Sequence, residues 1–113
     1  MQIARTDFEE ERGAVLVARW PERLDDEQRR RKYDEPLRAM MRKEGPEILF
    51  RGFSEVGEDG EVPCVRFELT FAVMKHGAWF AKRLMELGAP REGRVEIETE
   101  KASLEMSLAD VAQ

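Results

Sequence analysis

The sequence predicts an α+β fold in which two helices cover one face of a four-stranded antiparallel sheet. The first observation is the alternation in residues 64–71, where Val65, Phe67, Leu69 and Phe71 alternate with mostly polar residues. This is the pattern of a strand with one buried and one wet face. The second observation is a pair of segments with apolar residues at helical spacing, each followed by glycine and proline. In chain order the elements read β-α-β-β-α-β, which is the ferredoxin-like arrangement.

Two further segments have the character of strands at the two ends of this series. Residues 14–20 (AVLVARW) are apolar on both faces, as expected for a central strand. Pro21 ends this strand because it has no N–H to donate to a ladder. Residues 94–100 (RVEIETE) place Val95 and Ile97 inward and glutamates outward. The usual strand order, 4-1-3-2, puts the first and third strands in the centre, and these are the two most apolar strands.

Residues 47–53 (EILFRGF) predict the second strand, which pairs with the third through a hairpin. The Asp59-Gly60 pair marks the turn between them. Gly52 is a candidate β-bulge that would add twist to the second strand.

The first helix has two possible starting points within residues 24–45. Tyr33, Leu37 and Met41 fall at helical spacing there. Either a kinked helix starts near Asp25, or a shorter one starts at residues 34–36 with proline in its first turn. In both cases the Gly-Pro pair that follows ends the helix.

The second helix is predicted from residues 73–88, which contain the sequence KHGAWFAKRL. An apolar stripe runs along it, formed by Val73, Phe80, Leu84 and Leu87. We therefore interpret this segment as a packed helix.

The two ends of the chain are expected to be irregular or to form extra short elements, over residues 1–12 and 101–113. Residues 3–8 are a candidate fifth strand that would return through an EEERG turn. In the tail, either Ser107 and Asp110 cap one helical turn, or residues 104–108 form an extra strand.

Composition excludes several classes of function. The 113 residues fit a single domain, 1–113, with 38% charged residues and a net charge of −5. This charge opposes binding to nucleic acid, which requires clustered Lys and Arg. The basic run at 29–32 directly follows the acidic run at 25–27, so we interpret both as a solvated helix face. No apolar run approaches the roughly 20 residues of a membrane helix, and the N-terminus is too acidic for a secretory signal. We expect a cytoplasmic protein.

No residue pattern predicts catalysis, a metal or a cofactor. His76 is the single histidine of the chain, and a metal site needs about three or four ligands at fixed spacing. Cys64 is the single cysteine and has no evident base partner, so we interpret it as structural. Glycine-rich phosphate loops, G-x-S-x-G and H-E-x-x-H are absent from the sequence.

Trp79 and Arg83 form the first candidate binding pair. They lie four residues apart on the predicted helix, so the guanidinium is expected to stack on the indole. Alternatively they anchor a partner, since Trp and Arg are frequent at interface hot spots.

The outward face of the sheet is the second candidate surface. Its predicted partner-binding side chains are Arg66, Glu68, Glu96, Glu98 and Glu100, and Thr70 is also expected to point outward. The two strands that carry them have no outward aromatic residue, which disfavours RNA binding. The last three glutamates repel one another unless a cation or a basic partner faces them.

Two hypotheses of different classes follow. The first is a small acidic protein-binding module, of the inhibitor, immunity or regulatory type, that docks on a basic surface of another protein. The second is a homodimeric domain that binds or converts a small apolar ligand between sheet and helices. The cavity would be lined by Met40, Met41, Phe50, Phe53, Met74 and Met85.

Overall fold

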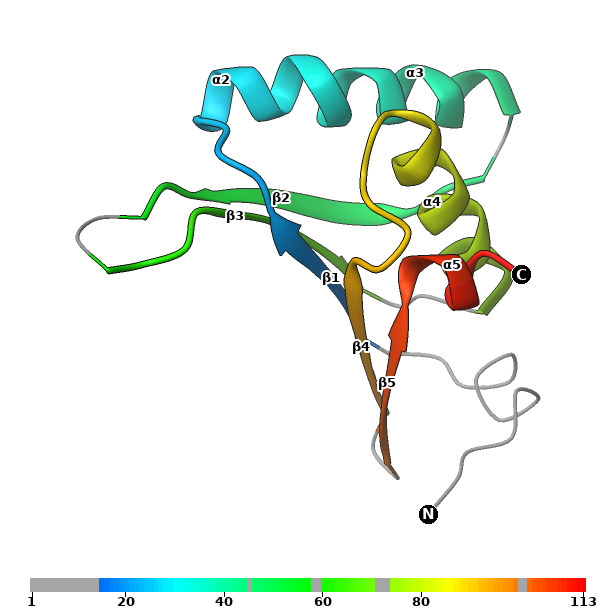
Figure 1. Ribbon diagram of the computed structural model, residues 1–113. Coiled ribbons are helices and arrows are strands. Elements are labelled where there is room, and N and C mark those ends of the chain that lie inside the picture. The colour runs from blue at the N-terminus through cyan, green and yellow to red at the C-terminus, as the bar shows by residue number, and fades with distance from the viewer. Residues whose placement is uncertain (1–14, 45, 58–59, 71–73, 100–101) are drawn as a thin grey trace.

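One antiparallel sheet with helices on one side makes up the molecule (Figure 1). The computed structural model describes residues 15–44, 46–57, 60–70, 74–99 and 102–113. Its strands are β1 (Val15–Pro21), β2 (Leu49–Glu55), β3 (Cys64–Thr70), β4 (Arg94–Glu98) and β5 (Ser103–Ser107). All neighbouring strands pair antiparallel, in the order β2-β3-β1-β4-β5. The chain is therefore a mixed α+β domain.

The predicted number of four strands is wrong, because β5 extends the sheet beyond β4. Val95 lies opposite Met106 and Ile97 opposite Leu104, so the new strand adds two apolar residues to the inner face. Both alternatives for the tail occur together. The chain leaves β5 and forms one short helix, α5 (Leu108–Val111), at whose start the hydroxyl of Ser107 accepts a hydrogen bond from the N–H of Asp110 at 3.1 Å. The expected strand at residues 3–8 lies outside the described residues.

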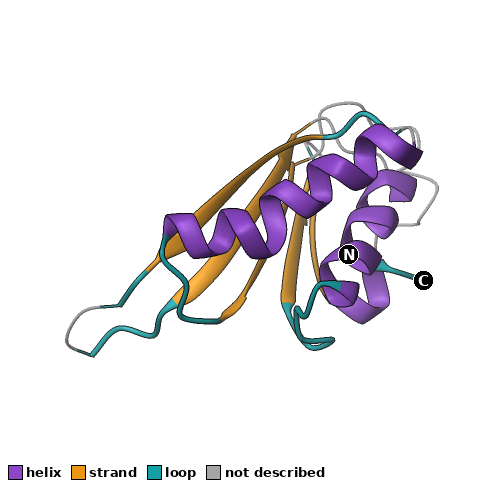
Figure 2. Ribbon diagram, turned by 90° about the horizontal axis from the view of Figure 1, so that it is seen from above, coloured by secondary structure: helices purple, strands orange, loops and turns teal. Residues whose placement is uncertain are grey.

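The first long helix is continuous and has an unusual middle (Figure 2). Its parts are α2 (Asp26–Arg29), a π-helical segment η1 (Arg30–Asp34) and α3 (Glu35–Glu44). Asp25 and Gln28 form a capping box, so the alternative that starts the helix near Asp25 is confirmed. In η1 the N–H of Glu35 donates to the carbonyl of Arg30, five residues back. This wider turn directly precedes Pro36, which has no N–H to continue the regular ladder.

The second long helix, α4 (Met74–Glu86), lies on the same side of the sheet as α2 and α3 (Figures 1 and 2). Phe80 and Leu84 are fully buried, as the apolar stripe predicts, whereas Val73 lies outside the described residues. No helix in the described ranges is long and apolar enough to span a membrane.

The core is an aromatic cluster between these helices and the inner face of the sheet. Phe67 lies at its centre and contacts the rings of Trp20, Tyr33, Phe50 and Phe80. Ring-centroid distances within the cluster are 5.1 to 6.0 Å. The alternation predicted for β3 is confirmed, because Val65, Phe67 and Leu69 are completely buried.

A buried ion pair joins the long helix to β2. The Nε of Arg29 donates to Asp34 at 3.2 Å, and the two side chains are only 7% and 10% exposed. The same guanidinium also donates to Asp26 at 3.0 Å and to the hydroxyl of Ser54 on β2 at 3.2 Å. The charge of Arg29 is thus matched by two carboxylates, one of them buried beside it.

The absence of a side chain at Gly52 allows the ion pair to pack against β2. The predicted bulge is wrong, because Gly52 pairs regularly with Phe67 in the β2–β3 ladder. A Cβ at this position would lie 2.8 Å from the Nε of Arg29, 2.9 Å from the ring of Phe67 and 3.0 Å from Asp34. The glycine is required by close packing, not by strand geometry.

Removing one partner of the buried pair should destabilise the protein far more than removing an exposed pair on the same helix. Arg29→Met leaves Asp34 buried and unpaired, so we expect a loss of about 3–5 kcal/mol in the free energy of unfolding. The control is Arg31→Met, because Arg31 and its partner Glu27 are both 70% exposed, and its loss should be about 0–1 kcal/mol. Urea unfolding measures both.

The double variant Arg29→Met/Asp34→Leu separates charge burial from packing. Removing both charges should recover most of the loss, because no buried charge is then left unpaired. Equal losses for Arg29→Met and Arg31→Met would contradict the role of the ion pair.

Candidate functional site

The outer face of the sheet carries a row of arginines. Strand register places Arg66 of β3 and Arg94 of β4 opposite Arg19 of β1. We call Arg66, Arg19 and Arg94 the arginine row. Phe53 of β2 lies opposite Arg66, whose guanidinium carbon is 4.2 Å from the centroid of the phenyl ring. Phe53, Arg19 and Arg94 were not predicted on this face, although the alternation in LFRGFSE, AVLVARW and RVEIETE places them outward.

A glutamate row runs beside the arginine row. It consists of Glu68 on β3, Glu96 on β4 and Glu105 on β5, with Val17 of β1 between the first two. Ion pairs connect the two rows: Arg66 lies 2.7 Å from Glu68, and Arg94 lies 2.7 Å from Glu105 and 3.9 Å from Glu96. Among the described residues of this face, Glu68 and Glu96, which were predicted to bind a partner, therefore already form ion pairs with arginines of the same sheet.

The β4–β5 end of this face is the exception. Glu96 lies directly opposite Glu105, and Glu98 lies on the same face one step further along β4. We call Glu96, Glu98 and Glu105 the acidic patch. Together with Ser103 and Leu104 they line a hollow of about 310 Å³. Glu98 is exposed and forms no ion pair with a described residue, whereas Glu100 lies outside the described residues.

Trp79 and Arg83 belong to a different surface. Both lie on α4, in the helical layer, whereas the predicted site residues Arg66, Glu68, Glu96 and Glu98 lie on the outer face of the sheet. The guanidinium carbon of Arg83 is 5.6 Å from the indole centroid. Glu44 at the end of α3 accepts a hydrogen bond from Trp79 at 3.3 Å and pairs with Arg83, which also pairs with Glu86 at 2.6 Å. The pair thus fastens α4 to α3, and the structure does not bring it together with the sheet residues.

Glu22 is the most heavily engaged carboxylate of the described chain. It accepts hydrogen bonds from the indole of Trp20 at 2.8 Å and from the hydroxyl of Tyr33 at 2.6 Å, and it pairs with Lys32. Burial alone would raise the pKa of Glu22. The hydrogen bonds from Lys32, Tyr33 and Trp20 together lower the pKa by more than burial raises it, so the net pKa is lowered. Burial and the neighbouring Glu22 raise the pKa of Tyr33. The cluster ties the end of β1 to the long helix.

His76 and Cys64 show no catalytic arrangement. His76 is half-buried on α4, and the described residues contain no group of three or more side chains that could hold a metal ion. The thiol of Cys64 donates to Glu55 at 3.0 Å, and burial together with this carboxylate raises its pKa. Reactive cysteines have lowered pKa values, because the thiolate is the nucleophile.

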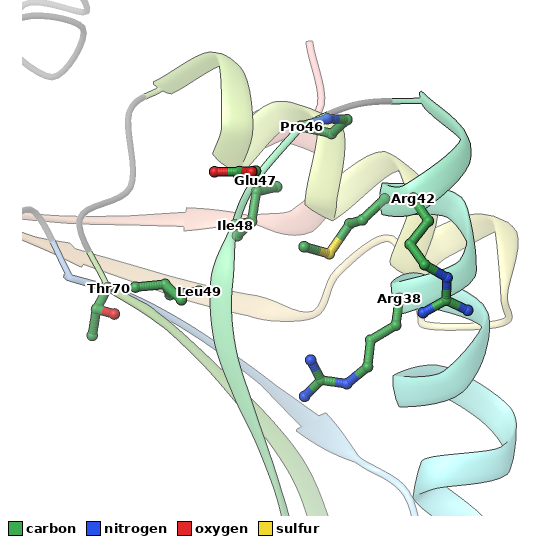
Figure 3. A pocket seen from close by; sticks show the side chains of 8 residues that line it. Arg38, Arg42, Pro46, Glu47, Ile48, Leu49 and Thr70 are labelled. Carbon is green, nitrogen blue, oxygen red and sulfur yellow. The ribbon is translucent and has the colours of Figure 1, made fainter.

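A groove of about 720 Å³ lies between α3 and the start of β2 (Figure 3). The residues that line it are Arg38, Met41, Arg42, Pro46, Glu47, Ile48, Leu49 and Thr70. Arg38 and Arg42 are exposed and form no ion pair with a described residue, and the guanidinium of Arg38 lies 4.5 Å from the ring centroid of Phe50. No local sequence pattern predicts this groove, because it depends on α3 lying beside the edge of the sheet.

The structure does not gather Met41, Phe50, Phe53 and Met85 around the one apolar cavity that was predicted for them. Phe50 is part of the core, Met41 lines the α3–β2 groove and Phe53 lies on the outer face of the sheet. Met85 lines a separate hollow beside α5. The side chain of Met74 lies outside the described part of the structure.

Comparisons with protein-family models, with curated proteins and with solved structures find no match for this chain. Functional inference therefore rests on the surfaces described above.

Replacing Glu22 by Gln should destabilise the protein in a pH-dependent way. The lowered pKa means that the carboxylate stabilises the fold above its unfolded pKa, and that this contribution is lost as the pH falls through the folded value. We expect Glu22→Gln to lose about 1.5–3 kcal/mol at pH 7, and the difference from the natural chain to shrink below about pH 4. Urea unfolding at several pH values measures this.

Glu47→Gln is the matched control, since Glu47 is exposed and has no ion-pair partner among the described residues. A pH-independent loss for Glu22→Gln, or an equal loss for the control, would show that the charge of Glu22 is not what stabilises the cluster.

Proposed function

We propose that this protein is a non-catalytic binding module that docks on a basic surface of another protein through its acidic patch. The observation that carries the proposal is the placement of Glu96 directly opposite Glu105, with Glu98 exposed on the same face. Like charges in opposite positions of two strands destabilise a sheet. Arg94 is the single cation in contact with the patch among the described side chains. A basic partner would remove this repulsion.

The chemistry of the partner follows from the patch. Carboxylates on β4 and β5 are suited to Lys and Arg side chains, which bind them through charge-assisted hydrogen bonds. The net charge of −5 favours encounter with a basic protein at low salt, and salt should weaken that encounter. The hydroxyl of Ser103, which lies opposite Glu98, gives the contact an uncharged polar component.

We also propose that the fold is the ferredoxin-like arrangement extended by one strand. The order β2-β3-β1-β4 within the sheet is the reverse listing of 4-1-3-2, and β5 is added outside β4. A cytoplasmic location stays a prediction from the sequence.

Neutralising the acidic patch should abolish retention of the basic partner. The triple variant Glu96→Gln/Glu98→Gln/Glu105→Gln keeps side-chain size and removes three charges. The control, Glu35→Gln/Glu47→Gln/Glu92→Gln, removes the same number of charges from exposed positions outside the patch. Each immobilised protein is exposed to lysate of its own source at low and high salt, and the retained proteins are quantified by mass spectrometry.

The proposal predicts one stoichiometric basic protein that is retained by the natural chain and by the control, but is lost from the patch variant and at high salt. Equal retention by the two variants, or a retained partner that is acidic, would overturn it.

A further inference from the structure

We infer a second binding site at the opposite edge of the sheet, in the α3–β2 groove, whose ligand is an extended peptide with alternating acidic and apolar residues. The site goes beyond the proposed function, because it lies on the far side of β3 and β1 from the acidic patch and has the opposite charge.

The backbone of β2 can receive such a peptide. β2 is the last strand of the described sheet on this side, so the N–H and C=O groups of its alternate residues point away from β3. The groove is lined by Ile48 and by side chains of the outer face, Leu49 and Thr70. Because the groove is lined by residues from both faces of the sheet, it lies at the open edge of β2. An added strand there would complete the hydrogen bonds of β2, as in β-augmentation.

The side chains around this edge fit apolar residues of a peptide. Leu49 is 66% exposed although it belongs to a strand, and it is one of the most exposed large apolar residues described. Met41 and Pro46 add further apolar surface to the groove. Burial of such exposed apolar surface favours association.

The two arginines define the acidic part of the ligand. Arg38 and Arg42 are one turn apart on α3, so their Cα atoms are separated by about 6 Å along the helix. Side chains on one face of a strand recur about every 6.6 Å. Carboxylates at alternate peptide positions therefore match the two guanidinium groups. The residues between them face the side of Leu49.

The arrangement of the groove agrees with this assignment. Figure 3 shows α3 and the start of β2 side by side, with Arg38 reaching from the helix toward the strand. It also shows the carboxylate of Glu47 pointing away from both arginines, so this acid leaves them available. The contact of Arg38 with the ring of Phe50, at 4.5 Å, holds its guanidinium over the strand.

A second copy of the chain fits this edge less well. A two-fold axis that places the two grooves against each other, near the start of β2, would bring Arg38, Arg42 and Arg51 of both copies close together. Juxtaposed like charges oppose such pairing. An acidic peptide from another protein is therefore the occupant that the charges favour.

The test uses the full chain and a fluorescein-labelled peptide of the sequence EVEVEV, with binding followed by fluorescence anisotropy. Control peptides are KVKVKV, which reverses the charge, and EEEVVV, which keeps the composition and loses the alternation. We expect one-to-one binding of EVEVEV and at least about tenfold weaker binding of both controls.

Protein variants then locate the site. Arg38→Gln/Arg42→Gln should weaken binding of EVEVEV by about tenfold or more. Arg23→Gln/Arg91→Gln removes the same charge from exposed positions outside the groove and should leave binding unchanged. All four positions are exposed, and thermal unfolding of each variant verifies that it folds.

Backbone pairing is tested with two further peptides, N-methylated on all glutamates or on all valines. Only one set of N–H groups of an added strand faces β2, so one of these peptides should fail to bind and the other should bind like the parent. Unchanged binding of both would overturn β-augmentation. Absence of binding at millimolar peptide, equal effects of the two double variants, or a two-to-two complex through chain pairing would overturn the acidic-peptide site.

Discussion

The buried ion pair of Arg29 with Asp34 is the interaction on which the arrangement of this molecule depends. The pair forms where α2 meets the π-helical segment, and the guanidinium of Arg29 also donates a hydrogen bond to the hydroxyl of Ser54. The long helix is therefore held over β2 at one position along the strand. Gly52 is the strand residue that makes the approach possible. A buried charge pair is weak evidence for stability, but an unpaired buried charge is costly, and this asymmetry specifies one register of helix on sheet.

The position of the helix has consequences for both candidate binding surfaces. With α2 held over Gly52 and Ser54, α3 lies beside the start of β2, and the α3–β2 groove forms between them. The charges of the sheet differ between its two edges. Arg38, Arg42 and Arg51 lie near the β2 edge, and the acidic patch lies at the β4–β5 end. Between the two lie the arginine and glutamate rows, which largely neutralise each other through ion pairs. The net charge of −5 therefore does not describe the two surfaces, because the α3–β2 groove carries exposed arginines and the acidic patch carries glutamates.

Patterns within single elements predicted the inner face of the sheet and much of the core, but not the charge arrangement. The alternation of Val65, Phe67 and Leu69 identifies a half-buried strand because burial of one face leaves a period of two. The arginine row cannot be found that way, because it depends on the register between three strands. β5 remained ambiguous since SLEMS is short and is followed at once by a helical turn. The requirement for glycine at position 52 was not predicted either, because it arises from close contacts with residues about twenty positions away in the sequence.

The predicted site residues lie on two separate surfaces, and contacts between different elements determine this arrangement. Trp79 and Arg83 are neighbours on one helix, and their stacking was predictable from spacing alone. Their attachment to Glu44 was not predictable, because it depends on how α3 and α4 pack against each other.

The claim that the two ends of the sheet are separate surfaces of opposite charge is tested most directly by NMR. Amide chemical shifts of the ¹⁵N-labelled chain are recorded during titration with hexalysine and, separately, with EVEVEV. Hexalysine should shift residues of β4 and β5, EVEVEV should shift residues of α3 and the start of β2, and neither should shift the exposed face of α4. Shifts of the same residues by both peptides, or shifts centred on Trp79, would contradict the division of the sheet into two surfaces.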